Sequence, residues 1–186
     1  MAKTGLKRPV CVLLNETQST PSYSGGMVVG KAISANISIE INETLLYADD
    51  GVAESVKAFK SGKISLNTDD IVYEVQGFLL GHTVTANSLT ANANDVAPHV
   101  GVGFYGSVIR SGVTKFRAIW LYKVKFGECA DESKTKGESI ESTTPTIEGT
   151  IMQLSNGDWK TEQIFETEAA AVIWLNSKAG ITEDDD

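Results

Sequence analysis

The chain has 186 residues and a mass of 19.9 kDa, which favours one compact domain, and its 41% hydrophobic and 22% charged residues exclude a disordered chain and a membrane protein. Sixteen Lys and Arg stand against 24 Asp and Glu, giving a net charge of −8; four of the acids close the chain, so −8 less those four charges leaves −4 for the rest. This net negative charge argues against a nucleic-acid-binding protein, because such binding depends on cations that neutralise phosphates. We expect one domain over residues 1–182 and an acidic tail over 183–186.

The cysteines and the N-terminal region indicate the cellular compartment of the protein. Two cysteines far apart in the sequence are too few for a disulfide scaffold, so we expect Cys11 and Cys129 to be reduced and buried. The cations near the N-terminus precede only five apolar residues, 10–14, which is too short for a signal peptide. These features predict a protein that is made and kept in a cytoplasm.

Composition and periodicity predict a mainly β fold. Val, Ile and Thr supply 16, 14 and 17 residues, and β-branched side chains favour strands. In residues 32–41, apolar and polar residues alternate, as in a strand with one buried face. The polar members of this strand are Ser34, Asn36, Ser38 and Glu40.

The longest hairpin signal lies in the second half of the chain. Residues 100–109 and 113–126 are two extended runs joined at 110–112, where Gly112 favours a turn. The pattern predicts one buried face on the second run, made of Phe116, Ala118, Trp120, Tyr122, Val124 and Phe126. The opposite face carries a basic stripe of Lys115, Arg117, Lys123 and Lys125, a candidate subunit interface.

Further elements follow from local signals. Residues 146–154 and 158–165 flank Asn156-Gly157, a pair that favours a type I′ hairpin turn. Residues 71–80 have apolar residues at helical spacing and end at a glycine, and residues 168–178 follow a capping threonine, so both predict short helices. Residues 18–26 and 86–98 predict long loops that become ordered only against a partner.

No pattern for catalysis, a cofactor or a metal emerges. Residues 101–106 spell G-x-G-x-x-G, but a strand continues after them where a dinucleotide site needs a helix, so we expect close backbone approach in a sheet instead. His82 and His99 lack metal-ligand spacing, so we expect both to be ordinary histidines in loops. We expect the acid pairs at 49–50 and 69–70 to occupy turns or helix caps, because adjacent side chains do not point to one site. We therefore expect a protein that is not an enzyme and needs no cofactor or metal.

Several runs of sequence carry a family resemblance. They include GLKRPVCVLL, GKAISANISIEINETLLYADD, SGKISLNTDDI, LLGHTV, HVGVGFYGSV, FRAIWLYKVKF, TKGESIESTTPTIEGTIM and NGDWKTEQIFETEAAAVIWLN. In this order and spacing, over about residues 5–181, the chain resembles the phi-thirteen type of major tail protein from long-tailed (siphovirus) bacteriophages and prophages.

The resemblance implies a tail tube subunit with a β-sandwich or barrel flanked by a helix. Six copies would form a ring, and rings would stack around a tape measure protein and join terminator and initiator proteins in the virion tail, after synthesis in the bacterial host. DNA would pass through the lumen without specific binding, so a lumen wall should lack cations. We therefore expect Ser34, Asn36, Ser38 and Glu40 to face the lumen.

A second hypothesis, from a different functional class, stays open. Tyr105, Trp120 and Tyr122 would form a stacking patch if they were exposed, which would suit a carbohydrate-binding β-sandwich of a phage or bacterial protein.

Overall fold

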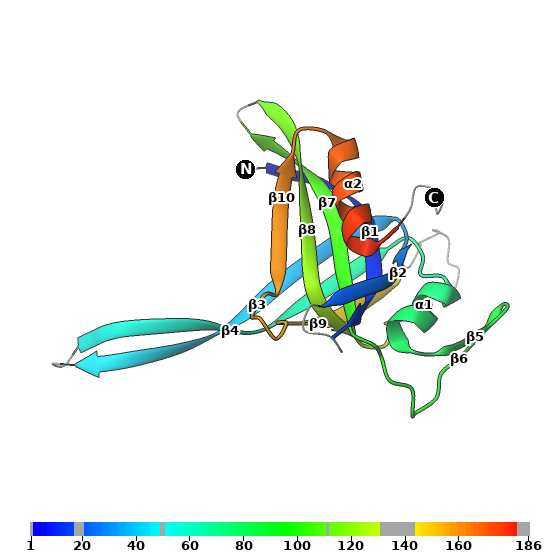
Figure 1. Ribbon diagram of the computed structural model, residues 1–186, viewed down its shortest axis with the longest axis horizontal. Coiled ribbons are helices and arrows are strands. Elements are labelled where there is room, and N and C mark those ends of the chain that lie inside the picture. The colour runs from blue at the N-terminus through cyan, green and yellow to red at the C-terminus, as the bar shows by residue number, and fades with distance from the viewer. Residues whose placement is uncertain (1, 17–20, 49–50, 111, 131–143, 182–186) are drawn as a thin grey trace, which may run out of the picture.

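The computed structural model describes residues 2–16, 21–48, 51–110, 112–130 and 144–181, and it has a mainly β fold with two short helices, which confirms the predicted fold class. The elements are β1 (Ala2–Asn15), β2 (Ser22–Val28), β3 (Ala32–Ala48), β4 (Gly51–Thr68), α1 (Tyr73–Leu80), β5 (Thr83–Thr85), β6 (Ser88–Thr90), β7 (Val100–Arg110), β8 (Val113–Phe126), β9 (Thr146–Met152), β10 (Lys160–Phe165) and α2 (Glu168–Ala179). Figure 1 shows their arrangement. The predicted tail at 183–186 lies outside the described residues.

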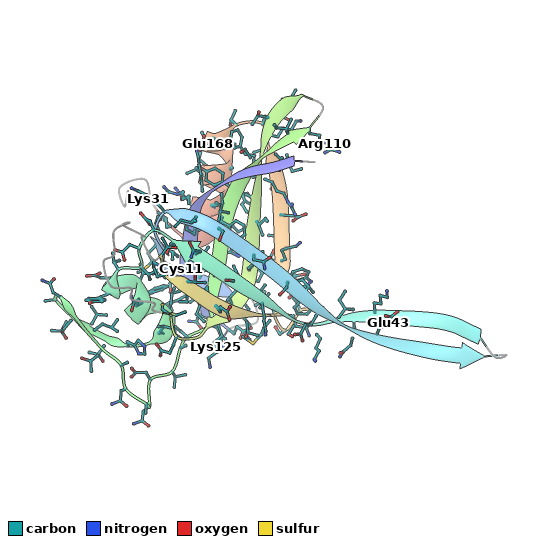
Figure 2. The ribbon with its side chains drawn as sticks, turned by 180° about the vertical axis from the view of Figure 1, so that it is seen from behind. Cys11, Lys31, Glu43, Arg110, Lys125 and Glu168 are labelled. Carbon is teal, nitrogen blue, oxygen red and sulfur yellow. The ribbon has the colours of Figure 1, made fainter. Side chains whose placement is uncertain are left out.

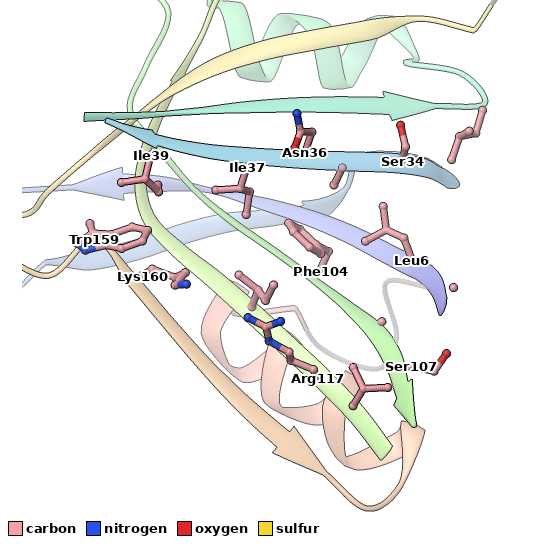
Figure 3. A pocket seen from close by; sticks show the side chains of 16 residues that line it. Leu6, Ser34, Asn36, Ile37, Ile39, Phe104, Ser107, Arg117, Trp159 and Lys160 are labelled. Carbon is pink, nitrogen blue, oxygen red and sulfur yellow. The ribbon is translucent and has the colours of Figure 1, made fainter. Parts of the chain in front are cut away.

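One antiparallel sheet of eight strands holds the molecule together. Its order is β2-β1-β7-β8-β9-β4-β3, and β10 also pairs with β8. The sheet branches at β8, because residues 116–121 pair with β10 whereas residues 123–126 pair with β9. The branch that contains β9, β4 and β3 turns back over the sheet, so β3 crosses over β1 and β7 (Figures 1 and 3).

The branching corrects one predicted hairpin. A turn does form at Asn156-Gly157, where the Gly157 N–H donates to the Leu154 carbonyl and Gly157 has a φ of 91°. The strands on either side of it do not pair with each other, however, since β9 pairs with β4 and β8 while β10 pairs with β8 alone. The predicted turn at Asn156-Gly157 is confirmed, but the predicted hairpin is wrong, because each flanking strand pairs with other strands of the sheet.

An irregularity in β8 corrects the predicted buried face. Val100 pairs with Val124 but Val102 pairs with Leu121, so β8 holds one extra residue there and its side-chain alternation reverses. Phe116, Ala118, Trp120 and Tyr122 pack in the cluster under α2, whereas Val124 and Phe126 pack in the other cluster, inside the curled sheet. The predicted single face is therefore two faces.

Each helix closes one core cluster. α1 lays Val75, Leu79 and Leu80 on the cluster inside the sheet and ends at Gly81 in the left-handed conformation. α2 covers Trp120 with Ala171 and Leu175. The Thr167 hydroxyl accepts a hydrogen bond from the Ala170 N–H and Gly180 ends the helix, as the sequence predicts.

The two predicted loops contain strands. Residues 22–28 form β2, which pairs with β1, and residues 88–90 form β6, which pairs with β5. Their polar composition hid them, because both strands lie at the surface and need few apolar residues.

Cys11 is buried and Cys129 is half-buried, so the expectation of a buried Cys129 was only partly right. No described helix has the length and apolar character to cross a membrane.

Candidate assembly surfaces

The predicted polar face of β3 is on the surface. Ser34, Asn36, Ser38 and Glu40 are exposed, while Ala35, Ile37 and Ile39 between them pack against the core. The apolar face is less complete than the alternation predicts, because Ile33 and Ile41 are 53% and 56% exposed. Whether the polar face lines a lumen stays a prediction.

Neighbouring strands extend this face. Ser38 pairs with Lys63 of β4, Lys63 pairs with Thr150 of β9, and Thr150 pairs with Lys125 of β8. Since directly paired residues point to the same side of a sheet, these side chains share one surface. We call it the polar face; its exposed members over the four strands are Ser34, Asn36, Ser38, Glu40, Lys63, Lys125, Glu148 and Thr150.

The polar face therefore differs from the prediction in its charge. The described strand β3 contributes no cation over residues 34–40, but Lys63 and Lys125 stand on the same surface as Glu40 and Glu148. Lys60, which is also exposed, lies 3.7 Å from Glu40, so cations and carboxylates are mixed on this face, and its other members are hydroxyl and amide groups.

The predicted basic stripe does not form one surface. The extra residue in β8 leaves Lys115 and Arg117 on one side of the sheet and Lys123 and Lys125 on the other. Lys115 Nζ lies 2.6 Å from a Glu166 carboxylate oxygen.

Within-chain carboxylates hold two more of these cations. Arg117 pairs with Glu162, and this guanidinium holds the pKa of the carboxyl below its usual range. Lys123 Nζ lies 2.5 Å from Glu16. Lys125 is exposed at the lower end of β8 (Figure 2).

An open groove of about 590 Å³ lies on the opposite side of β3 from the polar face. Ile37 and Ile39 of β3 form one wall, Phe104 of β7 faces them, and Trp159 closes one end (Figure 3). Ile119 of β8 also lines the groove. Leu6, Ser107, Arg117 and Lys160 also line it, and so do Ser34 and Asn36 of β3, although their side chains point away from the groove in Figure 3. The groove is thus mainly apolar with cations at its border.

The hairpin of β3 and β4 extends beyond the body of the sheet (Figures 1 and 2). β4 pairs with β9 only over residues 62–67, while β3 and β4 continue to pair with each other as far as Ala48 and Gly51. We call the part over residues 41–48 and 51–59 the arm. Glu43 and Lys57 form an ion pair across it at 3.4 Å. The acid pair 49–50 at its tip lies outside the described residues.

Sequence reasoning missed the surroundings of His82. Its imidazole is 4% exposed and contacts Asp95 and Glu128. These residues are 13 and 46 positions away, so no local pattern links the three. The other acid pair behaves as predicted: Asp69 Oδ1 accepts hydrogen bonds from the N–H groups of Lys31 and Asp70.

The glycine-rich run, residues 101–106, lies in the first half of β7. A Cβ atom on Gly103 would lie 2.5 Å from the Trp120 ring, and one on Gly101 would lie 2.8 Å from it. These two glycines make room for the indole of Trp120, a side chain, whereas the predicted close backbone approach occurs at Gly106, where a Cβ would lie 2.9 Å from the Gly5 carbonyl oxygen.

The aromatic residues that a carbohydrate site would need are largely in the core. Trp120 is 0% and Tyr105 is 5% exposed, so these two do not form a stacking surface. Within the described ranges, no three His, Cys, Asp or Glu side chains are grouped as metal ligands.

The chain matches no protein-family model, and no curated protein sequence matches it.

Proposed function

We propose that the chain is a structural subunit that assembles with its own copies into the tail tube of a long-tailed bacteriophage. Hexameric rings would stack around a tape measure protein, join terminator and initiator proteins, and conduct the genome into the host. The subunits would be made in the host cytoplasm and end in the virion tail. The family resemblance supplies this proposal, and features of the fold support it.

The arm is the observation that carries the proposal. A two-stranded hairpin alone in water is at best marginally stable. The arm nevertheless continues for many residues past its last contact with β9, and Ile41 on it is 56% exposed. Such an element gains stability when a second molecule covers it, which suits a protein whose role is contact with copies of itself.

Free strand edges support the same conclusion. Among the described strands, β2, β3 and β10 each pair on one side only. Unpaired backbone groups on an edge favour pairing with another chain. The groove adds an apolar concavity beside the edge of β3. Together these features give the subunit several surfaces suited to contacts between copies.

Electron microscopy of the purified protein tests the proposal. We expect tubes of uniform diameter. In a variant in which Asn-Gly replaces residues 44–56, the paired Glu43 and Lys57 would be joined by a two-residue turn, and we expect a folded protein that forms no tubes. The control replaces Ala86-Asn87 with Asn-Gly in the β5–β6 turn and should assemble normally.

Two results would count against this proposal. Normal tubes from the shortened arm would remove the observation on which it rests. A wild-type protein that stays monomeric at all concentrations and binds glycans would favour the carbohydrate-binding reading instead.

A further inference from the structure

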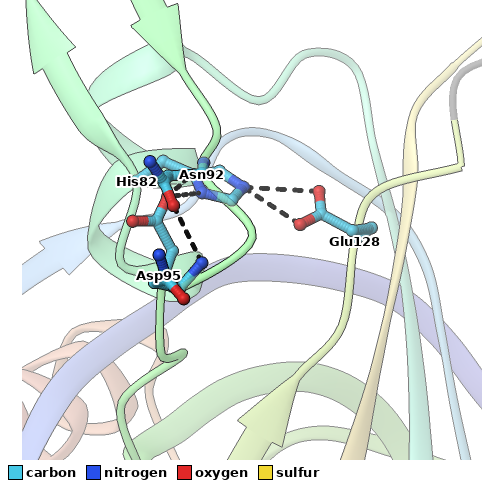
Figure 4. Close-up of polar contacts among 5 residues, drawn as sticks. His82, Asn92, Asp95 and Glu128 are labelled. Atoms are coloured by element: carbon cyan, nitrogen blue, oxygen red, sulfur yellow. Dashed lines mark hydrogen bonds and ion pairs between the residues drawn. The ribbon is translucent and has the colours of Figure 1, made fainter.

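His82 lies between two carboxylates that come from different parts of the chain. Its Nδ1 is 2.8 Å from Asp95 Oδ2, and its Nε2 is 3.1 Å from Glu128 Oε1 (Figure 4). The imidazole is 4% exposed, whereas the Glu128 side chain is 73% exposed. The histidine therefore occupies a closed position with one open, solvated partner.

The donor and acceptor count fixes the protonation state that suits this site. An ionised carboxylate only accepts hydrogen bonds, and a neutral imidazole has one N–H donor. Two carboxylates on the two ring nitrogens are both satisfied only by the imidazolium, which donates from both. With a neutral ring, one nitrogen lone pair would face a carboxylate.

Asp95 is itself held in a tight turn. Its Oδ2 accepts a hydrogen bond from the Asn92 N–H at 2.8 Å, and its own N–H donates to the Asn92 carbonyl. His82 follows Gly81, the residue that ends α1. The Asp95 contact thus joins the two ends of the segment that contains β5 and β6.

Glu128 belongs to a different part of the sheet. It follows β8, next to Gly127, whose N–H donates to the Glu148 carbonyl of β9. The His82–Glu128 contact therefore links the segment of residues 82–99 to the connection after β8. Within the described part of the chain, Asp95 and Glu128 are the charged groups that act on this imidazole.

We propose that protonated His82 is a clamp that fastens residues 82–99 to the connection after β8, and that loss of its proton releases this segment. Val96 in this segment is already 73% exposed, so its side chain contributes little apolar burial that would hold the segment in place. The inference is independent of the tube assembly proposed above.

The direction of the pH dependence follows from the two pKa changes. The hydrogen bond to Asp95, followed by the contacts with Glu128, raises the pKa of His82 above 6.5 despite its burial. The clamp is therefore fully formed below the ordinary histidine pKa and is lost as the pH rises through the raised value. Hydrogen bonds from Asn92 and His82 lower the pKa of Asp95, so the acid limit lies below its ordinary value of 3.8.

Nuclear magnetic resonance of protein with ¹⁵N-labelled histidine tests the protonation state. We expect protons on both His82 nitrogens at pH 6.5 and a titration above that pH. His99 is an internal control, because burial and the nearby Lys123 lower its pKa. A neutral His82 ring at pH 6 would overturn the proposal.

Hydrogen exchange tests the release itself. After correction for the intrinsic exchange rate, peptides within residues 83–98 should lose protection as the pH rises from 6 to 9. Glu128→Gln should move this loss to lower pH, His82→Gln should abolish the transition, and the control His99→Gln should keep it. Protection that does not change with pH, or an unchanged transition in both test variants, would refute the clamp; if His82→Gln fails to fold, Glu128→Gln alone decides.

Discussion

Replacing Gly103 with alanine tests how the cluster under α2 is built. The new Cβ would lie 2.5 Å from Trp120 Cε3 and 2.8 Å from Leu175 Cδ2, closer than carbon atoms pack. Gly103 does not have a positive φ, so the backbone accepts alanine and only the side-chain contacts change. Trp120 and Leu175 are both 0% exposed and have little room to move.

The cost follows from overpacking a filled core. An added methyl group in such a site destabilises by about 1–3 kcal/mol, and for a chain of this size each kcal/mol lowers Tm by about 2–4 °C. Gly103→Ala should therefore lower Tm by about 2–12 °C in a calorimetric scan. Gly127→Ala is the matched control, because its Cβ would come no closer than 3.9 Å to the Glu148 carbonyl oxygen.

A double-mutant cycle separates the clash from other effects. Trp120→Ala removes the indole and should itself cost roughly 3–5 kcal/mol. In the milder Trp120→Leu background the contacts with the indole are gone and only the contact with Leu175 remains, so the extra cost of Gly103→Ala should be smaller. If Gly103→Ala has the same Tm as Gly127→Ala, or the same cost in both backgrounds, the packing argument is wrong.

Three further predictions concern caps and thiols. Thr167→Ala removes the hydroxyl that caps α2 and should cost about 1 kcal/mol in a urea titration, whereas Thr167→Ser should cost less. Asp69→Ala removes the acceptor for two backbone N–H groups and should cost about 1–2 kcal/mol by the same measurement, and Asp69→Asn should retain part of that stability. Burial raises the pKa of Cys11 to about 12, so at pH 8 a thiol reagent should modify Cys129 in the native protein and leave Cys11 unmodified; equal labelling would contradict its burial.

Local signals were sufficient for several elements. The helix ends at Gly81 and Gly180 and the hairpin of β7 and β8 depend on residues that are neighbours in sequence, and the structure has all of them. Each of these features is decided by a cap, a turn residue or a short alternation. A single sequence contains that information.

Long-range pairing could not be predicted in the same way. Nothing near Val124 signals that β8 holds an extra residue opposite Val100 and Val102, yet this reverses the direction of every side chain beyond it. The same holds for His82, whose two carboxylates are brought to it by the fold. The positions that sequence reasoning missed are those whose partners are distant in the chain.

The polar face brings two predictions into conflict. Lys125 was predicted at a subunit interface, but it shares the polar face with Ser38 and Glu40, which were predicted to line a lumen. One surface of a subunit cannot both contact a neighbour and face an open bore. The composition of the face decides between them.

Stable interfaces are rich in buried aromatic and apolar residues at their centre. The described exposed residues of the polar face are hydroxyl, amide and charged groups, and the large exposed hydrophobic residues of the chain lie elsewhere, such as Ile33 at the groove. We therefore predict that Lys125 lies on the lumen side with Ser38, which departs from the expectation of a lumen wall without cations, and that Lys125→Glu assembles into normal tubes. Adding three cations to the same face should also allow assembly but slow genome delivery at low salt more than at high salt, because retention of DNA depends on neutralised phosphates; the substitutions are Ser34→Lys, Asn36→Lys and Ser38→Lys. Loss of tubes in Lys125→Glu, at unchanged Tm, would instead place the polar face between subunits.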